Sequence, residues 1–102
     1  MNEIHPSNTT FLLLLDEIKA LSARKQADYG KATDPFANVR ASEDFGIAGW
    51  IGAVVRMNDK MRRLQAAARG QNLKNESIED SLMDIAVYAL ISLVLYKEEN
   101  NA

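Results

Sequence analysis

Four carboxylates are concentrated at the start of one segment near the end of the sequence. Glu76, Glu79, Asp80 and Asp84 directly precede residues 85–96, which carry no charge. If this segment is a helix, acidic residues in its first turn complement the helix dipole and need no other role. Asp84 lies beyond the first turn, about 40° around the helix from Asp80, at the edge of the apolar part. A partly buried carboxylate at that position needs a counter-charge or a metal ion.

A second segment supplies candidate partners for these acids. Arg56, Lys60 and Arg63 follow helical spacing, so they lie along one side of a helix, with Asp59 among them. If the two helices pack antiparallel, this side can face Asp80 and Asp84. One interpretation is a structural seam of ion pairs. The other is a Mg²⁺ site, because Mg²⁺ prefers oxygen ligands and bridges to phosphates.

In the Mg²⁺ interpretation the metal ligands are drawn from Asp59, Glu76, Glu79, Asp80 and Asp84. Of these, Asp59, Asp80 and Asp84 are the candidate catalytic residues, since a carboxylate-bound metal ion can activate water. The cationic side chains of Arg56, Lys60 and Arg63 would hold the phosphates.

The segment "DYGKATDPFANVR", residues 28–40, is the other stretch with possible binding chemistry. Gly30, expected at positive φ, and Pro35 interrupt the helical pattern. In this segment and just before it, polar and cationic side chains are interspersed with aromatic ones: Lys25, Tyr29, Lys31, Phe36, Asn38 and Arg40. An aromatic face beside cationic donors suits a nucleotide, with the base stacked and the phosphate paired. Ordinary packing of Tyr29 and Phe36 against neighbouring helices is the alternative.

Three long helices and a short helical turn must position these groups, and no segment shows the alternation of a strand. The first helix is expected over about 8–28, with Ser7 as N-cap and Thr9 or Thr10 as rivals. The second covers about 48–69 and ends at Gly70. The third covers about 77–98 and starts with the capping-box pattern Ser77-x-x-Asp80. The short turn is expected over 36–42, which makes the fold all-α.

Apolar positions indicate which sides of these helices are buried. Two stripes follow helical spacing: Phe11, Leu14, Leu15, Ile18 and Leu21 in the first helix, and Trp50, Val54, Met57, Met61, Leu64 and Ala68 in the second. Trp50 is assigned to the core or an interface. Residues 85–96 are apolar on all sides, and such a helix must be covered by neighbours or by another chain. We therefore expect a homo-oligomer, a dimer or larger, formed through the third helix.

Composition sets the broad class. The 102 residues, 47% of them hydrophobic, suffice for one domain over 1–102, with a flexible lead at 1–7 and a polar tail at 98–102. The net charge of −2 argues against general nucleic-acid binding. There is no cysteine, and the one histidine, His5, is expected to be exposed and idle, which excludes a histidine zinc site or a Ser-His-Asp triad.

Neither apolar stretch has the features of a membrane segment. "FLLLLDEI" lacks the basic residues that open a signal peptide, and residues 85–96 are too few to span a bilayer. We expect a cytoplasmic protein without a membrane partner.

Four separated motifs carry a resemblance: "KQADYG" at 25–30, "DPFANVR" at 34–40, "RMNDKMRRL" at 56–64 and "ESIEDSLMDIAVYAL" at 76–90. Together they resemble phage nucleotide-modification-associated domains of unknown function. These in turn are similar to MazG-like all-α nucleoside triphosphate pyrophosphatases. The resemblance covers about Lys25 to Tyr88.

The MazG-like resemblance implies a four-helix core, oligomerisation, and Mg²⁺ held by an ExxE and an ExxD motif on successive helices. The implied reaction cleaves a nucleotide between the α and β phosphates and releases pyrophosphate. The sequence departs from this pattern, because Asp59 has no acidic partner three residues away and Ser81 stands where the glutamate of ExxD would be. We therefore expect a nucleotide-binding protein with Mg²⁺-dependent phosphoanhydride hydrolysis, or alternatively a module that binds or sequesters a nucleotide without turnover.

Overall fold

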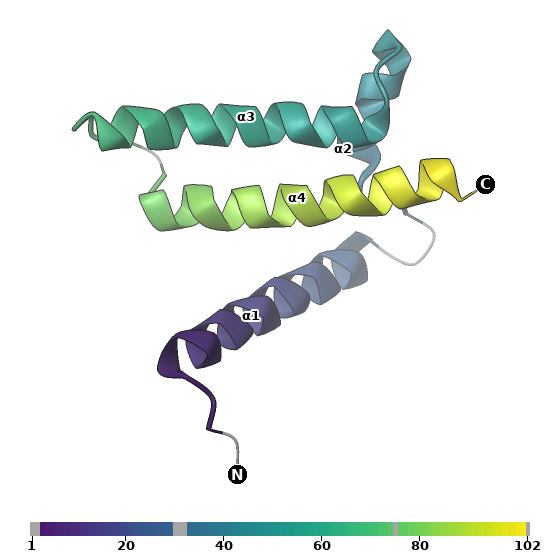
Figure 1. Cartoon of the computed structure of the whole chain (residues 1–102). Coiled ribbons are helices and arrows are strands. Elements are labelled where there is room, and N and C mark those ends of the chain that lie inside the picture. Colours follow the sequence, from purple (N-terminus) through teal and green to yellow (C-terminus); the bar gives the residue numbers. More distant parts are fainter. Residues whose placement is uncertain (1–2, 30–32, 75, 102) are drawn as a thin grey trace. The chain divides into compact units, whose positions relative to one another are not determined.

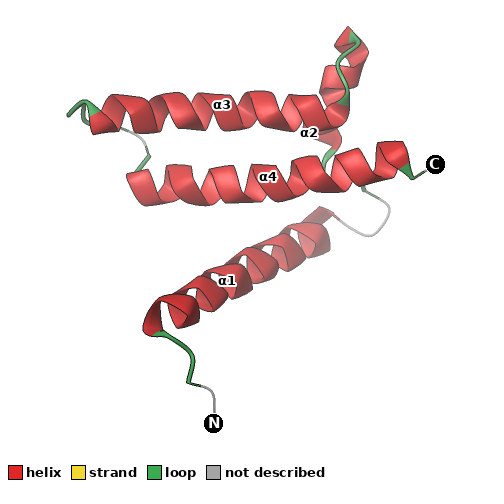
Figure 2. Cartoon of the chain, in the orientation of Figure 1, coloured by secondary structure: helices red, strands yellow, loops and turns green. Residues whose placement is uncertain are grey.

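The computed structural model describes residues 3–29, 33–74 and 76–101, and every regular element in these ranges is helical. The elements are α1 (Pro6–Tyr29), α2 (Ala37–Arg40), the 3₁₀ helix η1 (Ala41–Phe45), α3 (Gly49–Ala68) and α4 (Ile78–Asn100) (Figures 1 and 2). The prediction of an all-α chain with three long helices is confirmed. The short turn predicted over 36–42 is also present, and it continues to Phe45.

The chain divides into two compact units, Met1–Pro35 and Phe36–Ala102. The first contains α1, and the second contains α2, η1, α3 and α4. The expectation of one domain over 1–102 stays a prediction. Within the described ranges, none of the helices combines the length and the apolar character needed to cross a membrane.

The start of α1 differs from the predicted one. Pro6 is the first helical residue, a position that suits proline because its fixed φ is helical and it has no N–H to satisfy. The preceding residue, His5, accepts the N–H of Ser7 at Nδ1 (3.1 Å) and the N–H of Asn8 at its carbonyl oxygen (2.9 Å). Ser7 is therefore not the N-cap, and Thr9 and Thr10 also lie inside the helix. His5 is exposed as expected, but it is not idle.

The apolar residues of α1 do not form one stripe. The five consecutive residues 11–15 are all apolar and exposed, and five in a row cover every side of a helix. The predicted stripe from Phe11 to Leu21 is therefore only part of a broader apolar surface on α1. The predicted positive φ at Gly30 lies outside the described residues.

Helices α3 and α4 form an antiparallel hairpin and lie side by side (Figure 1). Gly70 follows α3 with a φ of 87°, and its N–H bonds to Ala67 O at 3.0 Å. Ser77 caps α4 through the predicted capping box: its Oγ accepts the Asp80 N–H at 3.0 Å, and Asp80 Oδ2 accepts the Ser77 N–H at 3.4 Å. Both predicted boundaries are confirmed, whereas α4 continues two residues beyond the predicted end, to Asn100.

The core of the second unit lies between α2, α3 and the C-terminal half of α4. Val39, Ala53 and Leu95 are buried, and four larger side chains pack against them: Phe36, Trp50, Tyr88 and Ile91. The Trp50 and Tyr96 rings meet edge to face with centroids 5.5 Å apart. The assignment of Trp50 to the core is confirmed.

The predicted stripe of α3 is only partly buried: Trp50, Met57 and Leu64 are half-buried. Val54 and Met61 are 40% and 44% exposed, whereas Ala53 is completely buried. The small Ala53 is what allows α3 to approach its neighbours closely. The choice of Val54 and Met61 as core residues was therefore wrong.

Gly52 fixes how closely η1 packs on α3. A Cβ at this position would lie 2.6 Å from Ser42 Oγ and 2.9 Å from Val39 O. The segment after η1 then turns at Gly46, whose φ is 74°, and leaves Phe45 83% exposed. This arrangement shapes a hollow beside α3 that is part of the candidate site.

Candidate functional site

Lys60 lies at the centre of an ion-pair cluster between α3 and the start of α4. Its Nζ is 2.6 Å from Glu76 Oε1 and 2.8 Å from Asp84 Oδ2. Its side chain is 18% exposed, and that of Glu76 is 13% exposed. Hydrogen bonds to Asp84 and then to Glu76 raise the pKa of Lys60 above its ordinary value. The ammonium group thus links the helix pair near its connecting loop.

Glu76 has both of its carboxylate oxygens engaged. Oε2 accepts a hydrogen bond of 2.5 Å from the hydroxyl of Ser81, which is completely buried, and lies 3.5 Å from Arg63 Nη1. The Lys60 hydrogen bond, followed by that of Ser81, lowers the pKa of Glu76 from 4.5 to about 2. Glu76 is therefore ionised in the folded protein over the whole neutral and mildly acidic range.

Two cations face two carboxylates in this cluster, Lys60 and Arg63 against Glu76 and Asp84. The prediction that Asp84 is paired is confirmed by its 2.8 Å distance to Lys60. Asp84 keeps 42% of its side chain exposed, so its pairing occurs at the edge of the seam and not in the interior. Formal charges of +2 and −2 cancel, which leaves little net attraction for a phosphate here.

The remaining predicted acids lie outside the cluster. Asp59, Glu79 and Asp80 are exposed, and none of the ion pairs found between described residues includes them. Asp80 instead caps α4, the structural alternative that its position in the first turn suggested.

The carboxylates do not fit the magnesium site that the resemblance implies. Within the described part of the chain, no three Asp, Glu, His or Cys side chains are grouped so that they could hold a metal ion. Lys60 Nζ lies between Glu76 and Asp84, at the position that a cation bound by both would take. The protein's own ammonium group therefore neutralises the pair.

Arg56 differs from the other cations of its stripe. Among the described residues it has no carboxylate partner, and its Nη2 donates only to the Asn38 carbonyl oxygen, at 3.3 Å. It borders an open hollow of about 300 Å³ between α2, η1 and α3. The other lining residues are mostly apolar: Asn38, Val39, Ala41, Ser42, Phe45, Ile47, Gly52 and Val55. The hollow offers an apolar surface with a guanidinium group at its edge.

Two residues of the predicted loop motif have structural partners. Arg40 Nη2 forms a 2.6 Å ion pair with Glu98 Oε2 near the end of α4. Phe36 packs against the core, in agreement with the packing alternative and not with base stacking. Of this motif, Asn38 and Val39 line the hollow beside Arg56.

Lys25 and Tyr29 belong to α1, in the other unit. The Lys25 side chain is exposed. The Tyr29 side chain, which was predicted to stack on a base, and all of Lys31 lie outside the described residues.

Ser81, Phe45 and Glu98 were not expected to contribute to these sites. Ser81 and Glu76 are five residues apart across a helix N-terminus, and helical periodicity alone does not connect them. The sequence did indicate that Phe45 is exposed, because an aromatic residue directly before a glycine in a polar segment has few apolar neighbours to cover it. Glu98 was assigned to the polar tail, although its spacing of three from Leu95 places it beside the core.

Comparisons of the chain with models of known protein families, with curated proteins and with solved structures found no match. The similarity to MazG-like pyrophosphatases and to the phage domains therefore stays a prediction from the four sequence motifs.

Proposed function

We propose that this protein binds a nucleotide in the hollow beside α3, with an anionic phosphate on Arg56 and the base against the apolar wall. The observation that carries the proposal is that Arg56 has no carboxylate partner among the described residues and borders an apolar hollow. An arginine with unused donors binds phosphate oxygens in pairs, because its planar fork matches their spacing.

The exposed ring of Phe45 supports the base-binding part of the proposal. It lines the same hollow, and its 83% exposure leaves the ring available to a planar ligand. The volume of about 300 Å³ lies at the lower end of the range for small-molecule sites. A base and its sugar would occupy it, and the phosphates would extend along Arg56 toward solvent.

A second hollow, near the hairpin loop, is less suited to a phosphate. It has a volume of about 400 Å³ and is lined by loop residues together with Glu76 and the start of α4. The ionised carboxylate of Glu76 would repel an anion there. Lys60 and Arg63, which are nearby, already face Glu76 and Asp84.

Binding without turnover is the form of the function that this geometry supports best. Hydrolysis of a phosphoanhydride with Mg²⁺ would need carboxylates that are free to hold the metal, and Lys60 takes that position between Glu76 and Asp84. Mg²⁺-dependent hydrolysis therefore rests on the sequence resemblance alone.

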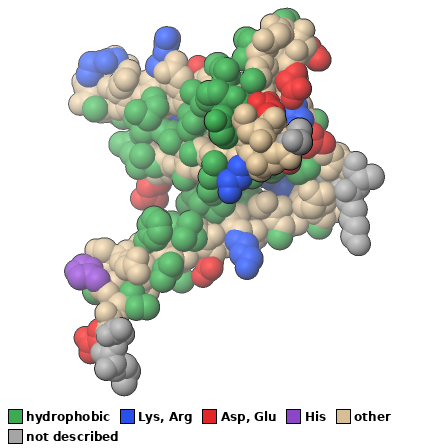
Figure 3. Space-filling model, turned by 45° about the vertical axis from the view of Figure 1, so that its right-hand side comes forward, with side chains coloured by type: hydrophobic (Ala, Val, Ile, Leu, Met, Phe, Trp, Pro, Cys, Tyr) green, Lys and Arg blue, Asp and Glu red, His purple; other side chains and the backbone are tan. Residues whose placement is uncertain are grey.

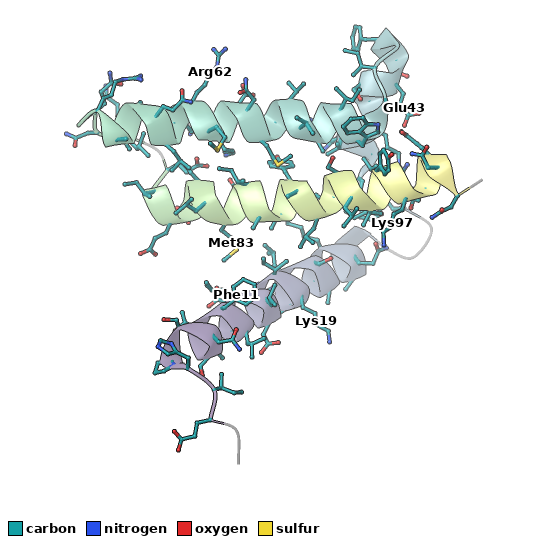
Figure 4. All side chains as sticks on the ribbon, in the orientation of Figure 1. Phe11, Lys19, Glu43, Arg62, Met83 and Lys97 are labelled. Carbon is teal, nitrogen blue, oxygen red and sulfur yellow. The ribbon has the colours of Figure 1, made fainter. Side chains whose placement is uncertain are left out.

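Calorimetric titration with a nucleoside triphosphate and with the corresponding nucleoside tests the proposal. Arg56→Ala should weaken triphosphate binding by about 1.5–3 kcal/mol, the value of a hydrogen bond to a charged group, and should leave nucleoside binding nearly unchanged. Arg62→Ala is the matched control, because Arg62 lies on the same helix, points away from α4 and has no ion pair among the described residues (Figure 4). Phe45→Ala should weaken the binding of both ligands.

Equal losses for both ligands in Arg56→Ala, or an equal loss in Arg62→Ala, would contradict the phosphate assignment. The titrations should be repeated with Mg²⁺ and with a chelator, while pyrophosphate release is monitored. We expect similar affinity in both conditions and no product. Affinity that requires Mg²⁺, together with pyrophosphate release, would instead support the hydrolase that the resemblance implies.

A further inference from the structure

Helix α4 has a second apolar side, about 110° around the helix from the one that packs on α3. Ser81, Ser92 and Leu95 face α3 and are buried. The outer stripe consists of exposed apolar residues at helical spacing: Ile78, Leu82, Ala86, Ala89 and Leu93. Ile78, Leu82 and Leu93 are each at least half exposed, and hydrophobic side chains are widely visible on the surface (Figure 3). No charged residue interrupts the outer stripe.

The outer stripe is symmetric about a point between Val87 and Tyr88. Ala86 and Ala89 lie equally far from that point, and so do Leu82 and Leu93. In an antiparallel pair of identical helices related by a two-fold axis at this point, Leu82 lies opposite the partner's Leu93 and Ala86 opposite the partner's Ala89. Small residues at the centre allow close approach, and larger residues on both sides of it fill the space between the helices. A surface that complements itself in this way fits a two-fold dimer.

Charges at the two ends of the outer stripe favour the same arrangement. Glu79 and Lys97 are both exposed, and helical spacing places them on the same flank of α4. In the antiparallel pair, Glu79 comes level with the partner's Tyr96, about 1.5 Å along the axis from the partner's Lys97. A parallel pair would instead bring Glu79 beside the partner's Glu79.

From these relationships we infer that the protein forms an antiparallel two-fold dimer through the outer stripe of α4, with Glu79 paired to the partner's Lys97 at each end. The occupant of the stripe is thus a second copy of this chain. The inference does not depend on nucleotide binding, because none of these residues lines the hollow beside Arg56.

Sedimentation velocity over a dilution series tests the stoichiometry. Wild type should sediment as a dimer, and Leu82→Asp, which places a carboxylate on the stripe, should shift the mass to that of a monomer. Val54→Asp is the control, since Val54 is an exposed apolar residue on α3, and it should remain dimeric. A monomeric wild type, as expected if α1 of the same chain covers the stripe, would overturn the inference. So would a Leu82→Asp variant that stays dimeric.

Charge reversal tests the pairing without placing a charge on the apolar stripe. Glu79→Lys and Lys97→Glu should each weaken the dimer, and the double variant should restore it at the same helix content. Two single changes that weaken the dimer, with no recovery in the double variant, would overturn the Glu79–Lys97 pairing.

Disulfide formation tests the orientation, and the absence of natural cysteine makes it specific. Mixed Leu82→Cys and Leu93→Cys chains should form a disulfide on oxidation, and neither should do so alone. Efficient linkage within the Leu93→Cys preparation alone would indicate a parallel pair and overturn the inference.

Discussion

The hydroxyl of Ser81 donates a 2.5 Å hydrogen bond to Glu76 Oε2 across the N-terminus of α4. Ser81 has no exposed surface, and within the described residues no buried polar side-chain atom lacks a hydrogen-bond partner. The bond orients the Glu76 carboxylate so that its other oxygen meets Lys60. A glutamate at position 81, as in the ExxD motif, would place a like charge beside Glu76.

Ser81→Ala should destabilise the protein by about 1–3 kcal/mol, since it removes a hydrogen bond to a charged acceptor. Ser92→Ala is a matched control, because Ser92 is also buried but donates to a neutral acceptor, Trp50 O, at 2.8 Å. Urea denaturation at pH 7 measures both variants. A loss in Ser81→Ala no larger than that in Ser92→Ala would contradict the special role of the carboxylate.

The lowered pKa of Glu76 predicts a loss of stability in acid. The folded protein binds this proton less readily than the unfolded chain, because Lys60 and then Ser81 stabilise the carboxylate. The contribution of Glu76 is complete above pH 4.5 and is lost as the pH falls toward about 2. Urea midpoints between pH 7 and pH 2 should fall less steeply for Glu76→Gln than for wild type.

Lys60 should make the stability fall at high pH, whereas Glu76 makes it fall at low pH. Its pKa is raised above 10.5 in the folded state, first by Asp84 and then by Glu76, so folding strengthens proton binding. Its stabilising contribution is complete below pH 10.5 and is lost as the pH rises through the raised pKa. Urea midpoints measured above pH 10.5 should fall for wild type and stay constant for Lys60→Met. Equal falls in both proteins would contradict the contribution of Lys60.

Lys60→Met should destabilise the protein more than Asp84→Asn. Removing Lys60 leaves Asp84 unpaired and leaves Glu76 with Arg63, at the longer distance of 3.5 Å, as its remaining cation beside the Ser81 hydrogen bond. We expect a cost of about 1–3 kcal/mol. Asp84 is 42% exposed, and pairs that are open to water contribute at most about 1 kcal/mol. Thermal melts compare the two variants, with Arg62→Met as the control. A larger drop in melting temperature for Asp84→Asn than for Lys60→Met would contradict the central role of Lys60 in the cluster.

Gly52→Ala should destabilise the second unit even though alanine is the better helix former. The new methyl group would lie 2.6 Å from Ser42 Oγ and 2.9 Å from Val39 O, and overpacking of this kind costs about 1–3 kcal/mol. The intrinsic helical preference for alanine recovers about 1 kcal/mol of that. A variant with a melting temperature at or above that of wild type would show that η1 moves away from α3 at little cost.

The helices themselves could be predicted because their ends depend on nearby residues. Ser77 and Asp80 form a capping box within one turn, and Gly70 ends α3 by adopting a φ that other residues avoid. The start of α1 was predicted less accurately. Ser7 is a common N-cap residue, but Pro6 favours the first helical position, and the side chain of His5 substitutes for a hydroxyl cap.

The buried side of α3 could not be derived from residue size. Val54 and Met61 are larger than Ala53 and fit a helical stripe, but close approach of α3 to α2 and α4 buries the small residue instead. Which side of a helix with several apolar residues is covered depends on the neighbouring helix, and a single sequence does not contain that information.

The candidate site could be predicted in part. Helical spacing placed the stripe of Arg56, Lys60 and Arg63 opposite Asp80 and Asp84 once an antiparallel pair was assumed. The Lys60–Asp84 pair is present, whereas none of the ion pairs between described residues includes Asp80. The role of Glu76 could not be predicted, because its position depends on the loop between α3 and α4. Asp80 was a candidate both for the capping box and for the Mg²⁺ site. The Ser77-x-x-Asp80 pattern predicts the capping role more directly, and this is the role that the structure shows.

The connection between α3 and α4 also has a consequence for folding kinetics. The Lys60–Glu76 contact closes a loop of only sixteen residues, whereas Ser92 and Trp50 are 42 apart and Gly49 and Glu99 are 50 apart. Loop closure costs more entropy as the loop lengthens, so the hairpin should form first beside its loop and then extend toward the core. Under this hypothesis, substitutions at Lys60 slow folding and substitutions at Leu95 mainly accelerate unfolding, and stopped-flow φ-values distinguish the two. A higher φ-value at Leu95 than at Lys60 would reverse that order of assembly.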